Sequence, residues 1–186
     1  MFKVANVNIY GLDESVRGAK FPMSVSVDSL DYSVTKGIDT LGRAEPGSGH
    51  DNFLNGVIVQ FDLTCSNKMW VEMERYHFVD FVSSQSTMHR AAKMDFAQAF
   101  NSYVTSRTLI ECNRLKAAYQ EDPSAENYLR LLYNLPSGME LTARMTTNYR
   151  QLKTIYKQRK DHRLPEWREF CQWLETLPHA EWITRN

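Results

Sequence analysis

The sequence contains few cysteines and no long hydrophobic run, and both deficits exclude whole classes of protein. Only 3 cysteines occur among 186 residues, at positions 65, 112 and 171. An odd number at this spacing suits neither a disulfide framework nor a CxxC metal site, so we expect no structural zinc. No apolar run approaches the roughly 18–20 residues that span a bilayer, and the amino terminus lacks the apolar core of a signal peptide. We therefore expect a soluble, cytoplasmic protein without a membrane partner.

The chain also lacks a net charge, because 22 Lys and Arg residues balance 22 Asp and Glu residues. It therefore exerts no overall attraction on nucleic acid, and we expect no nucleic-acid partner. Basic residues are nevertheless concentrated between Arg144 and Arg168, where the only acidic residues are Asp161 and Glu166. This cluster could form a local anion site or an open nucleic-acid surface, although the balanced total charge weighs against the second.

The composition is that of a folded protein of ordinary size. Hydrophobic residues make up 42% of the chain and charged residues 24%, which excludes a disordered or fibrous polypeptide. Since domains commonly run to roughly 100–200 residues, we expect residues 1–186 to form a single domain.

Sequence periodicity predicts an α/β fold in which helix dominates. Alternating apolar residues predict strands at residues 2–9, 21–29 and 57–63. Residues rich in Gly, Pro or Ser predict loops at 36–52 and 80–87. Helical spacing and capping residues predict helices at 66–77, about 96–121, 124–133, about 139–160 and from 165 onward.

The predicted helix over residues 139–160 carries the most information about function. At 100° per residue, one narrow stripe holds Leu141, Met145, Asn148, Leu152, Ile155 and Arg159. An amide and a guanidinium on an apolar face are costly unless they have partners. Arg159 either reaches solvent or a carboxylate from the last turn, or faces a pocket that holds an anionic or carbonyl-bearing ligand. The pattern leaves both explanations open.

A second stripe of the same helix is basic. It carries Arg150, Lys153 and Lys157, which cannot share the surroundings of Arg159 within one subunit. This stripe is either a solvated face or, in an oligomer, part of a site assembled from two chains.

The spacing of these residues is that of a known motif. Asn148-x-Arg150-x-Leu152 is followed by Arg159, nine residues after Arg150, and is preceded by Leu135-Pro136. This pattern resembles the carboxyl-terminal half of the flavin-dependent thymidylate synthases.

A second segment agrees with the first. Gly49-His50 precedes the strand at 57–63, and Arg75-Tyr76-His77 and Ser86 follow it. This order is similar to the family's Gly-His, strand, helix, Arg-His-Arg and distal Ser series. Together the two segments cover roughly residues 48–175, and two motifs in the correct order are more specific than either alone.

The resemblance implies a fold and a chemistry. The fold is a helix-rich single α/β domain with a small, mostly antiparallel sheet, and the family's enzymes are homotetramers whose active sites lie at subunit interfaces. They bind FAD and a pyrimidine deoxynucleotide, deoxyuridylate. They convert it to thymidylate with methylenetetrahydrofolate, using hydride from flavin that NADPH has reduced. Since no protein nucleophile attacks the uracil, orientation and electrostatic polarisation should carry catalysis.

The resemblance also assigns roles to individual residues. Arg159 matches the arginine that contacts uracil, and His50 matches a histidine near the flavin and folate; these two are the catalytic candidates. The candidates for substrate binding are Arg159, Ser86, Arg90, Glu72 and Arg75. The candidates for flavin binding are His50, Arg75, His77, Arg150 and Thr154. Glu72 stands where the family usually has glutamine.

Several of these side chains also have ordinary structural explanations. Arg75 could simply pair with Glu72 or Glu74. His50 and Ser86 could be polar residues of loops.

The motifs depart from the family pattern in residue type and in spacing, since eight residues rather than seven separate His77 from Ser86, and the chain is shorter than is common in the family. The Arg-His-Arg motif has become Arg75-Tyr76-His77, so one permanent positive charge near the flavin is lost unless His77 is protonated. Met88 occupies the position two residues after Ser86 where the family usually has Arg. Two functions therefore stay open: methylation of deoxyuridylate or a close pyrimidine nucleotide, and nucleotide binding by a homologue that has lost flavin redox chemistry.

Overall fold

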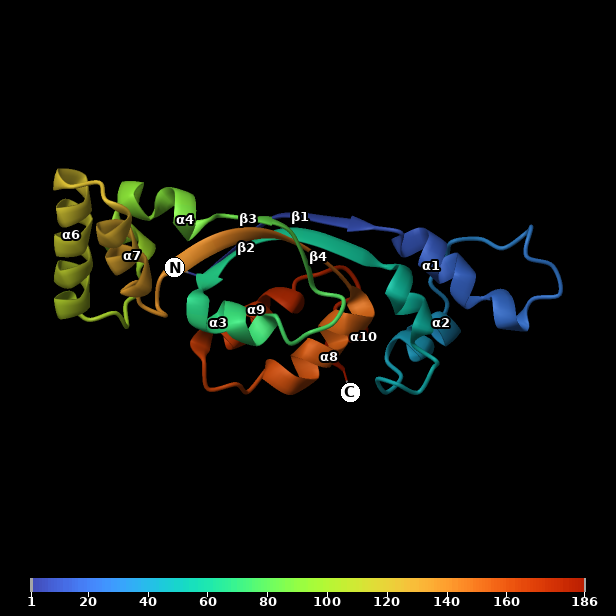
Figure 1. Cartoon of the computed structure of the whole chain (residues 1–186). Helices are drawn as coiled ribbons and strands as arrows, with labels where there is room; N and C mark the ends of the chain where they lie inside the picture. Colours follow the sequence, from blue (N-terminus) through green and yellow to red (C-terminus); the bar gives the residue numbers. More distant parts are fainter. Residues whose placement is uncertain (1, 186) are drawn as a thin grey trace.

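The architecture combines one small sheet with many short helices (Figure 1). The computed structural model describes residues 2–185. The strands are β1 (Lys3–Tyr10), β2 (Ile58–Ser66), β3 (Asp80–Ser84) and β4 (Glu140–Asn148). The α-helices are α1 (Leu12–Ala19), α2 (Lys36–Gly42), α3 (Asn67–Met73), α4 (Thr87–Arg90), α5 (Phe96–Ala99), α6 (Ser106–Glu121), α7 (Ala125–Tyr133), α8 (Tyr149–Arg159), α9 (Pro165–Leu174) and α10 (Glu181–Thr184). Short 3₁₀ turns are η1 (Phe21–Met23), η2 (Asn52–Gly56) and η3 (Ala91–Lys93).

The four strands form one antiparallel sheet in the order β1-β2-β4-β3. Side chains of β2 alternate between buried and half-buried along its length, which is the pattern of a strand with one face on a core. Helices α3, α8 and α9 lie together on one side of the sheet (Figure 1). The expected helix-rich fold with a small antiparallel sheet is confirmed.

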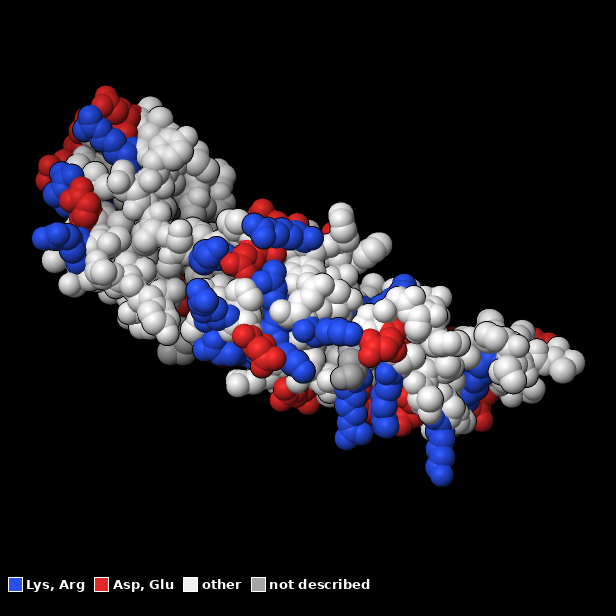
Figure 2. Space-filling model, turned by 90° about the horizontal axis from the view of Figure 1, so that it is seen from below, with Lys and Arg blue, Asp and Glu red and all other residues white. Residues whose placement is uncertain are grey.

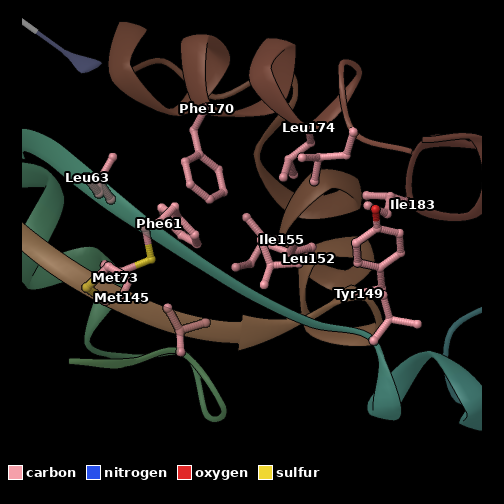
Figure 3. Packing of buried hydrophobic residues seen from close by; sticks show 14 of the residues in the cluster. Phe61, Leu63, Met73, Met145, Tyr149, Leu152, Ile155, Phe170, Leu174 and Ile183 are labelled. Atoms are coloured by element: carbon pink, nitrogen blue, oxygen red, sulfur yellow. The ribbon is translucent and has the colours of Figure 1, made fainter. Parts of the chain in front are cut away.

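The main core fills the space between the sheet and these helices (Figure 3). This core includes Phe61 and Met145 from the sheet, Leu152 and Ile155 from α8 and Phe170 from α9, and Phe61 lies between the sheet and the two helices (Figure 3). All five side chains are fully buried. Burial of this apolar surface holds α8 and α9 against the sheet and fixes the positions of their polar residues.

A second hydrophobic cluster lies under α5, α6 and α7 and centres on Phe96, Leu115 and Leu131. Strand β4 connects the two clusters, because Leu141 packs against the second and Met145 belongs to the first. This continuity supports the proposal that residues 1–186 form one domain. Among residues 2–185, no helix is both long and apolar enough to cross a bilayer.

The predicted helix over residues 139–160 is wrong in its first half. Residues 140–148 form β4, and α8 begins at Tyr149. Both β2 and β3 pair with this segment, and Ala143, Met145 and Thr147 alternate as its buried residues. Asn148 is not a helical core residue, since its Oδ1 accepts a hydrogen bond from the Gln151 amide at 2.9 Å and caps α8.

Two other predictions of strand and loop are wrong. Residues 21–29 do not form a strand. They contain η1 and an irregular segment that pairs with none of the described strands, and Val25 in this segment is fully exposed. Residues 80–87 are not a loop throughout, because 80–84 form the edge strand β3. All five of its residues are exposed, and only pairing with β4 defines it.

The remaining differences concern one predicted loop that contains a helix and the bounds of two predicted helices. The predicted loop 36–52 contains α2, which Thr35 caps, and the start of η2. The predicted helix over 96–121 is divided into α5 and α6, each with its own capping residue. The helix that Ser66 caps ends at Met73 rather than near 77. The strands near 2–9 and 57–63, the helix after Ser124 and the helix that Pro165 opens are confirmed.

Candidate functional site

Arg159 lies in a half-enclosed cluster between α8, α3 and α9. Its Nε donates a hydrogen bond to the Tyr76 hydroxyl at 2.7 Å, and its Nη1 donates to Oε2 of Glu72 at 3.2 Å. The guanidinium also lies 4.8 Å from the centre of the Trp167 ring, which is a cation–π distance. The Arg159 side chain is 16% exposed. One of the two explanations for Arg159 was a carboxylate partner, and the structure supplies this partner as Glu72.

Glu72 is the anionic centre of this cluster. Its Oε2 accepts from Arg159 and from Trp167 Nε1, and its Oε1 pairs with Lys68 at 3.1 Å. Burial raises the pKa of the Glu72 carboxyl, but hydrogen bonds from Lys68 and Trp167 outweigh burial and hold that pKa below its ordinary value of 4.5. Glu72 is therefore ionised at neutral pH and compensates the charge of Arg159.

Tyr76, the second residue of the altered motif, also belongs to this cluster. It accepts from Arg159 and donates its own proton to Gln158 Oε1 at 2.9 Å. Burial is the main cause that raises the pKa of the Tyr76 hydroxyl above 10.0, so the group stays protonated. His162 lies 3.5 Å from Glu72, and burial followed by the charge of Arg159 lowers its pKa. A guanidinium has five N–H donors, and within residues 2–185 only some of those of Arg159 are used.

The other stripe of α8 faces the segment before β2. Arg150 Nε lies 3.4 Å from Oδ1 of Asp51, and Lys153 Nζ lies 3.5 Å from Oδ2 of the same carboxylate. Both Asp51 and Lys153 are fully buried. The interpretation of this stripe as a solvated face is therefore wrong for Lys153. Thr154 remains on the stripe and donates its hydroxyl proton to the Arg150 carbonyl at 3.3 Å.

Sequence reasoning missed Asp51 altogether. The signal that could have found it is an acidic residue directly after His50, paired with an otherwise unexplained basic stripe on α8. His50 itself is exposed and follows Gly49, whose φ of +82° lies in the left-handed region that favours glycine.

The outer members of the altered motif point away from the cluster. Arg75 and His77 are exposed, while Tyr76 between them is half-buried. Within the described part of the chain Arg75 forms no ion pair, so its expected pairing with Glu72 or Glu74 is not present. Both side chains are open to a ligand or a neighbouring subunit.

Ser86 and Arg90 lie at the two ends of α4, beside the second hydrophobic cluster. The Tyr128 hydroxyl of α7 reaches the carbonyls of Thr87 and Met88 at 3.3 and 2.5 Å and holds α4 in place. The predicted site residues thus form separate groups within one chain. Arg159 contacts Glu72, and Arg150 lies against the segment that contains His50. Ser86 and Arg90, at the two ends of α4, form the third group.

A groove of about 1180 Å³ opens elsewhere, between the segment joining α5 to α6 and the start of α9. Its polar wall includes Lys68, Tyr103 and Arg163. None of the predicted site residues lines it. Figure 2 shows that basic side chains gather over the middle of the helical face but alternate with acidic ones, which is unlike an uninterrupted nucleic-acid surface.

Comparison with known proteins places this geometry in context. No family model and no curated protein matches the sequence. Among solved structures, the chain is similar to ThyX from Helicobacter pylori, a flavin-dependent thymidylate synthase crystallised with FAD and dUMP. One such structure has a TM-score of 0.77 at 16% identity, with 97% of each chain covered. Another has a TM-score of 0.79 at 13% identity, covering 100% of this chain and 98% of the other.

The chain has the fold of the flavin-dependent thymidylate synthases. The likeness covers 97% or more of the chain and therefore includes the motifs from Gly49 to Arg159. The resemblance predicted from those motifs is confirmed at the level of the flavin-dependent thymidylate synthase fold. The low identity fits a diverged sequence, of which Arg75-Tyr76-His77 is one instance.

Proposed function

We propose that this protein binds FAD and deoxyuridylate and methylates the nucleotide to thymidylate, with methylenetetrahydrofolate and NADPH as co-substrates. The observation that carries the proposal is a full-length match in fold to an enzyme crystallised with FAD and dUMP, combined with both motif arginines on α8. Nine residues separate these arginines, so they project from nearly opposite faces of the helix. One helix can therefore serve two neighbouring sites.

The residues present fit a flavin. Arg150 pairs with Asp51 at 3.4 Å through Nε, and its side chain remains 32% exposed, so the guanidinium can also donate to an anionic or carbonyl-bearing group. The exposed Arg75, His77 and His50 add further donors, and Thr154 neighbours Arg150 on the same face. FAD, when bound, supplies the hydride that the chemistry requires.

The protein's own residues would then bind and orient the nucleotide. Arg159 can donate to a uracil carbonyl oxygen, and Glu72, Tyr76 and Trp167 hold its guanidinium in one orientation. A fixed donor of this kind lowers the cost of polarising the ring because it needs no reorganisation during the reaction. All three cysteines are buried, so none is presented to a ligand as a nucleophile.

The separation of the site residues favours an oligomer. Ser86 and Arg90 lie on α4, next to a different hydrophobic cluster from the one that holds Arg159. If they bind the same nucleotide, as the motif order implies, α4 of one subunit must meet α8 of another. We therefore propose a homotetramer with active sites between subunits.

The experiment that tests the proposed function is a product assay with purified protein. We expect dUMP to gain one methyl group, detected by mass spectrometry, when FAD, NADPH and methylenetetrahydrofolate are all supplied. Arg159→Lys should reduce nucleotide affinity because the ammonium lacks the planar fork of donors. Lys160→Met, on the neighbouring residue, is the matched control. Folded protein that forms no thymidylate and binds no flavin would overturn the proposal.

A second function is favoured by one specific contact. Arg159 Nε donates a hydrogen bond to the hydroxyl of Tyr76, and Tyr76 stands at the motif position where the family has histidine. If Arg159 binds the pyrimidine, this contact brings a tyrosine next to that nucleotide, and the altered motif offers the flavin fewer basic groups. A nucleotide-binding protein without redox chemistry would bind dUMP in a calorimetric titration and take up no FAD.

A further inference from the structure

Asp51 is a fully buried carboxylate at a junction of three segments. It directly follows the exposed His50, and its two oxygens face two different cations of α8. Oδ1 lies 3.4 Å from Arg150 Nε, and Oδ2 lies 3.5 Å from Lys153 Nζ. Burying a carboxylate is costly, and neither oxygen of Asp51 accepts a hydrogen bond within the described residues. The ion pairs with these two cations are therefore what compensates its burial.

Lys153 anchors the junction from the other side. Its Nζ donates to the Gly42 carbonyl at 2.9 Å and also to the Ala44 carbonyl, at the end of α2. The ammonium therefore joins the residues after α2, the residue after His50 and helix α8. The two oxygens of Asp51 share one negative charge, so the carboxylate pairs with Lys153 through Oδ2 and with Arg150 through Oδ1.

The atom through which Arg150 is held decides what the rest of its side chain can do. A guanidinium that is paired at Nε still has its two terminal amino groups, which form a planar fork of donors at the end of the side chain. The Arg150 side chain is 32% exposed, whereas Asp51 is 0% exposed. Arg150 therefore reaches from a buried carboxylate to the surface of the protein.

We propose that Asp51 is a positioning residue that fixes the Arg150 guanidinium through Nε and thereby presents its two terminal amino groups to FAD. Lys153 completes the arrangement, because its ammonium pairs with the second oxygen of Asp51 and holds the carboxylate in place. The part that concerns FAD rests on the proposed function, and the orientation of Arg150 by Asp51 does not. Neither Asp51 nor Lys153 belongs to the motifs that carry the family resemblance.

The first test needs no ligand. The Nε–H resonance of Arg150 is identified by NMR through its loss in Arg150→Lys, and its exchange with water is measured. We expect slow exchange in the unaltered protein, fast exchange in Asp51→Asn and slow exchange in Glu45→Gln. Glu45 is the matched control, since it is an acidic residue of the same segment whose partner Lys157 is exposed. Equal exchange in Asp51→Asn and the unaltered protein would overturn the proposal.

The second test measures FAD affinity in a double-mutant cycle. We expect Asp51→Asn to raise the dissociation constant of FAD about tenfold in the unaltered background, but less than about twofold in an Arg150→Met background. A merely structural role for Asp51 would raise it by the same factor in both backgrounds, and this result would overturn the proposal.

Loss of folding is handled by a charge-balanced variant. If Asp51→Asn alone unfolds the protein, Asp51→Asn with Lys153→Met removes both charges and leaves no unpaired ammonium. The same two readouts then apply to it. If the unaltered protein binds no FAD, the proposed function fails, while the NMR measurement still decides whether Asp51 orients Arg150.

Discussion

The Nη1 atom of Arg159 lies 3.2 Å from Oε2 of Glu72, although 87 residues separate the two in the sequence. Both side chains are largely buried, with exposed fractions of 16% and 13%. The pair joins the end of α8 to α3 and places the proposed uracil-binding arginine beside Tyr76 and Trp167. Glu72 also faces Lys68 and His162, so its charge compensates more than one cation.

Replacement of Glu72 by glutamine should destabilise the protein. Glu72→Gln leaves the largely buried Arg159 without its anionic partner, and we expect the free energy of unfolding to fall by about 1–3 kcal/mol. Urea denaturation at pH 7 measures this. The control is Glu126→Gln, because Glu126 pairs with Arg130 on an exposed face and should contribute less than about 1 kcal/mol. Equal losses in both variants would contradict the central role of Glu72.

Acidification should destabilise the protein through His162. Burial, followed by the charge of Arg159, lowers the pKa of His162 below its ordinary value of 6.5. The unfolded chain therefore takes up this proton first, and stability should fall as the pH drops from 6.5 toward the lower pKa of the folded state. The midpoint of urea denaturation between pH 7.5 and 5.5 tests this. His162→Gln should flatten the dependence and His89→Gln, on exposed α4, should not; equal slopes would refute the assignment.

The thiols should be unreactive until the protein unfolds. Cys65, Cys112 and Cys171 are 0%, 1% and 2% exposed, and burial raises the pKa of Cys171 to about 12. Because the thiolate is the reactive form, we expect negligible reaction with a disulfide reagent in the native protein. All three thiols should react in denaturant. A rapidly reacting thiol in native protein would show that at least one cysteine is accessible to a substrate.

Gly42 should tolerate no side chain. A Cβ at this position would lie 2.5 Å from Cγ of Trp182, which is itself fully buried. Gly42→Ala should therefore lower the free energy of unfolding by about 1–3 kcal/mol. In Gly18→Ala the new methyl meets no atom within 4 Å, and this helical position should gain up to about 1 kcal/mol. Thermal unfolding of both variants checks the contrast, and equal shifts would contradict the packing at Gly42.

Local patterns predicted the parts of the fold that local interactions determine. The caps Ser66 and Ser124 were predictable because a hydroxyl that accepts from amides of the first turn needs no distant partner. The strand at 57–63 was predictable because apolar residues alternate along its sequence, and burial in β2 alternates with the same period of two. Pro165 begins α9 since its fixed φ suits the first turn.

Long-range pairing explains what the sequence did not predict. Leu141 and Met145 are four residues apart, which fits a helical stripe as well as one face of a strand, and only pairing with β2 and β3 decides between them. Strand β3 has no buried residue, so it carries no hydrophobic pattern at all. At the site, sequence position predicted Arg159 from the motif but not its partner Glu72. The burial of Lys153 with Asp51 was also missed, because their pairing depends on two segments that are distant in the sequence.

The visible absorption spectrum of the purified protein tests the central claim most directly. The protein is incubated with FAD, with or without dUMP, separated from unbound flavin and then mixed with NADPH in the absence of oxygen. We predict that flavin absorbance stays with the protein and that NADPH bleaches it. Folded protein that retains no flavin, with or without dUMP, would contradict the proposed function and favour a nucleotide-binding protein without redox chemistry.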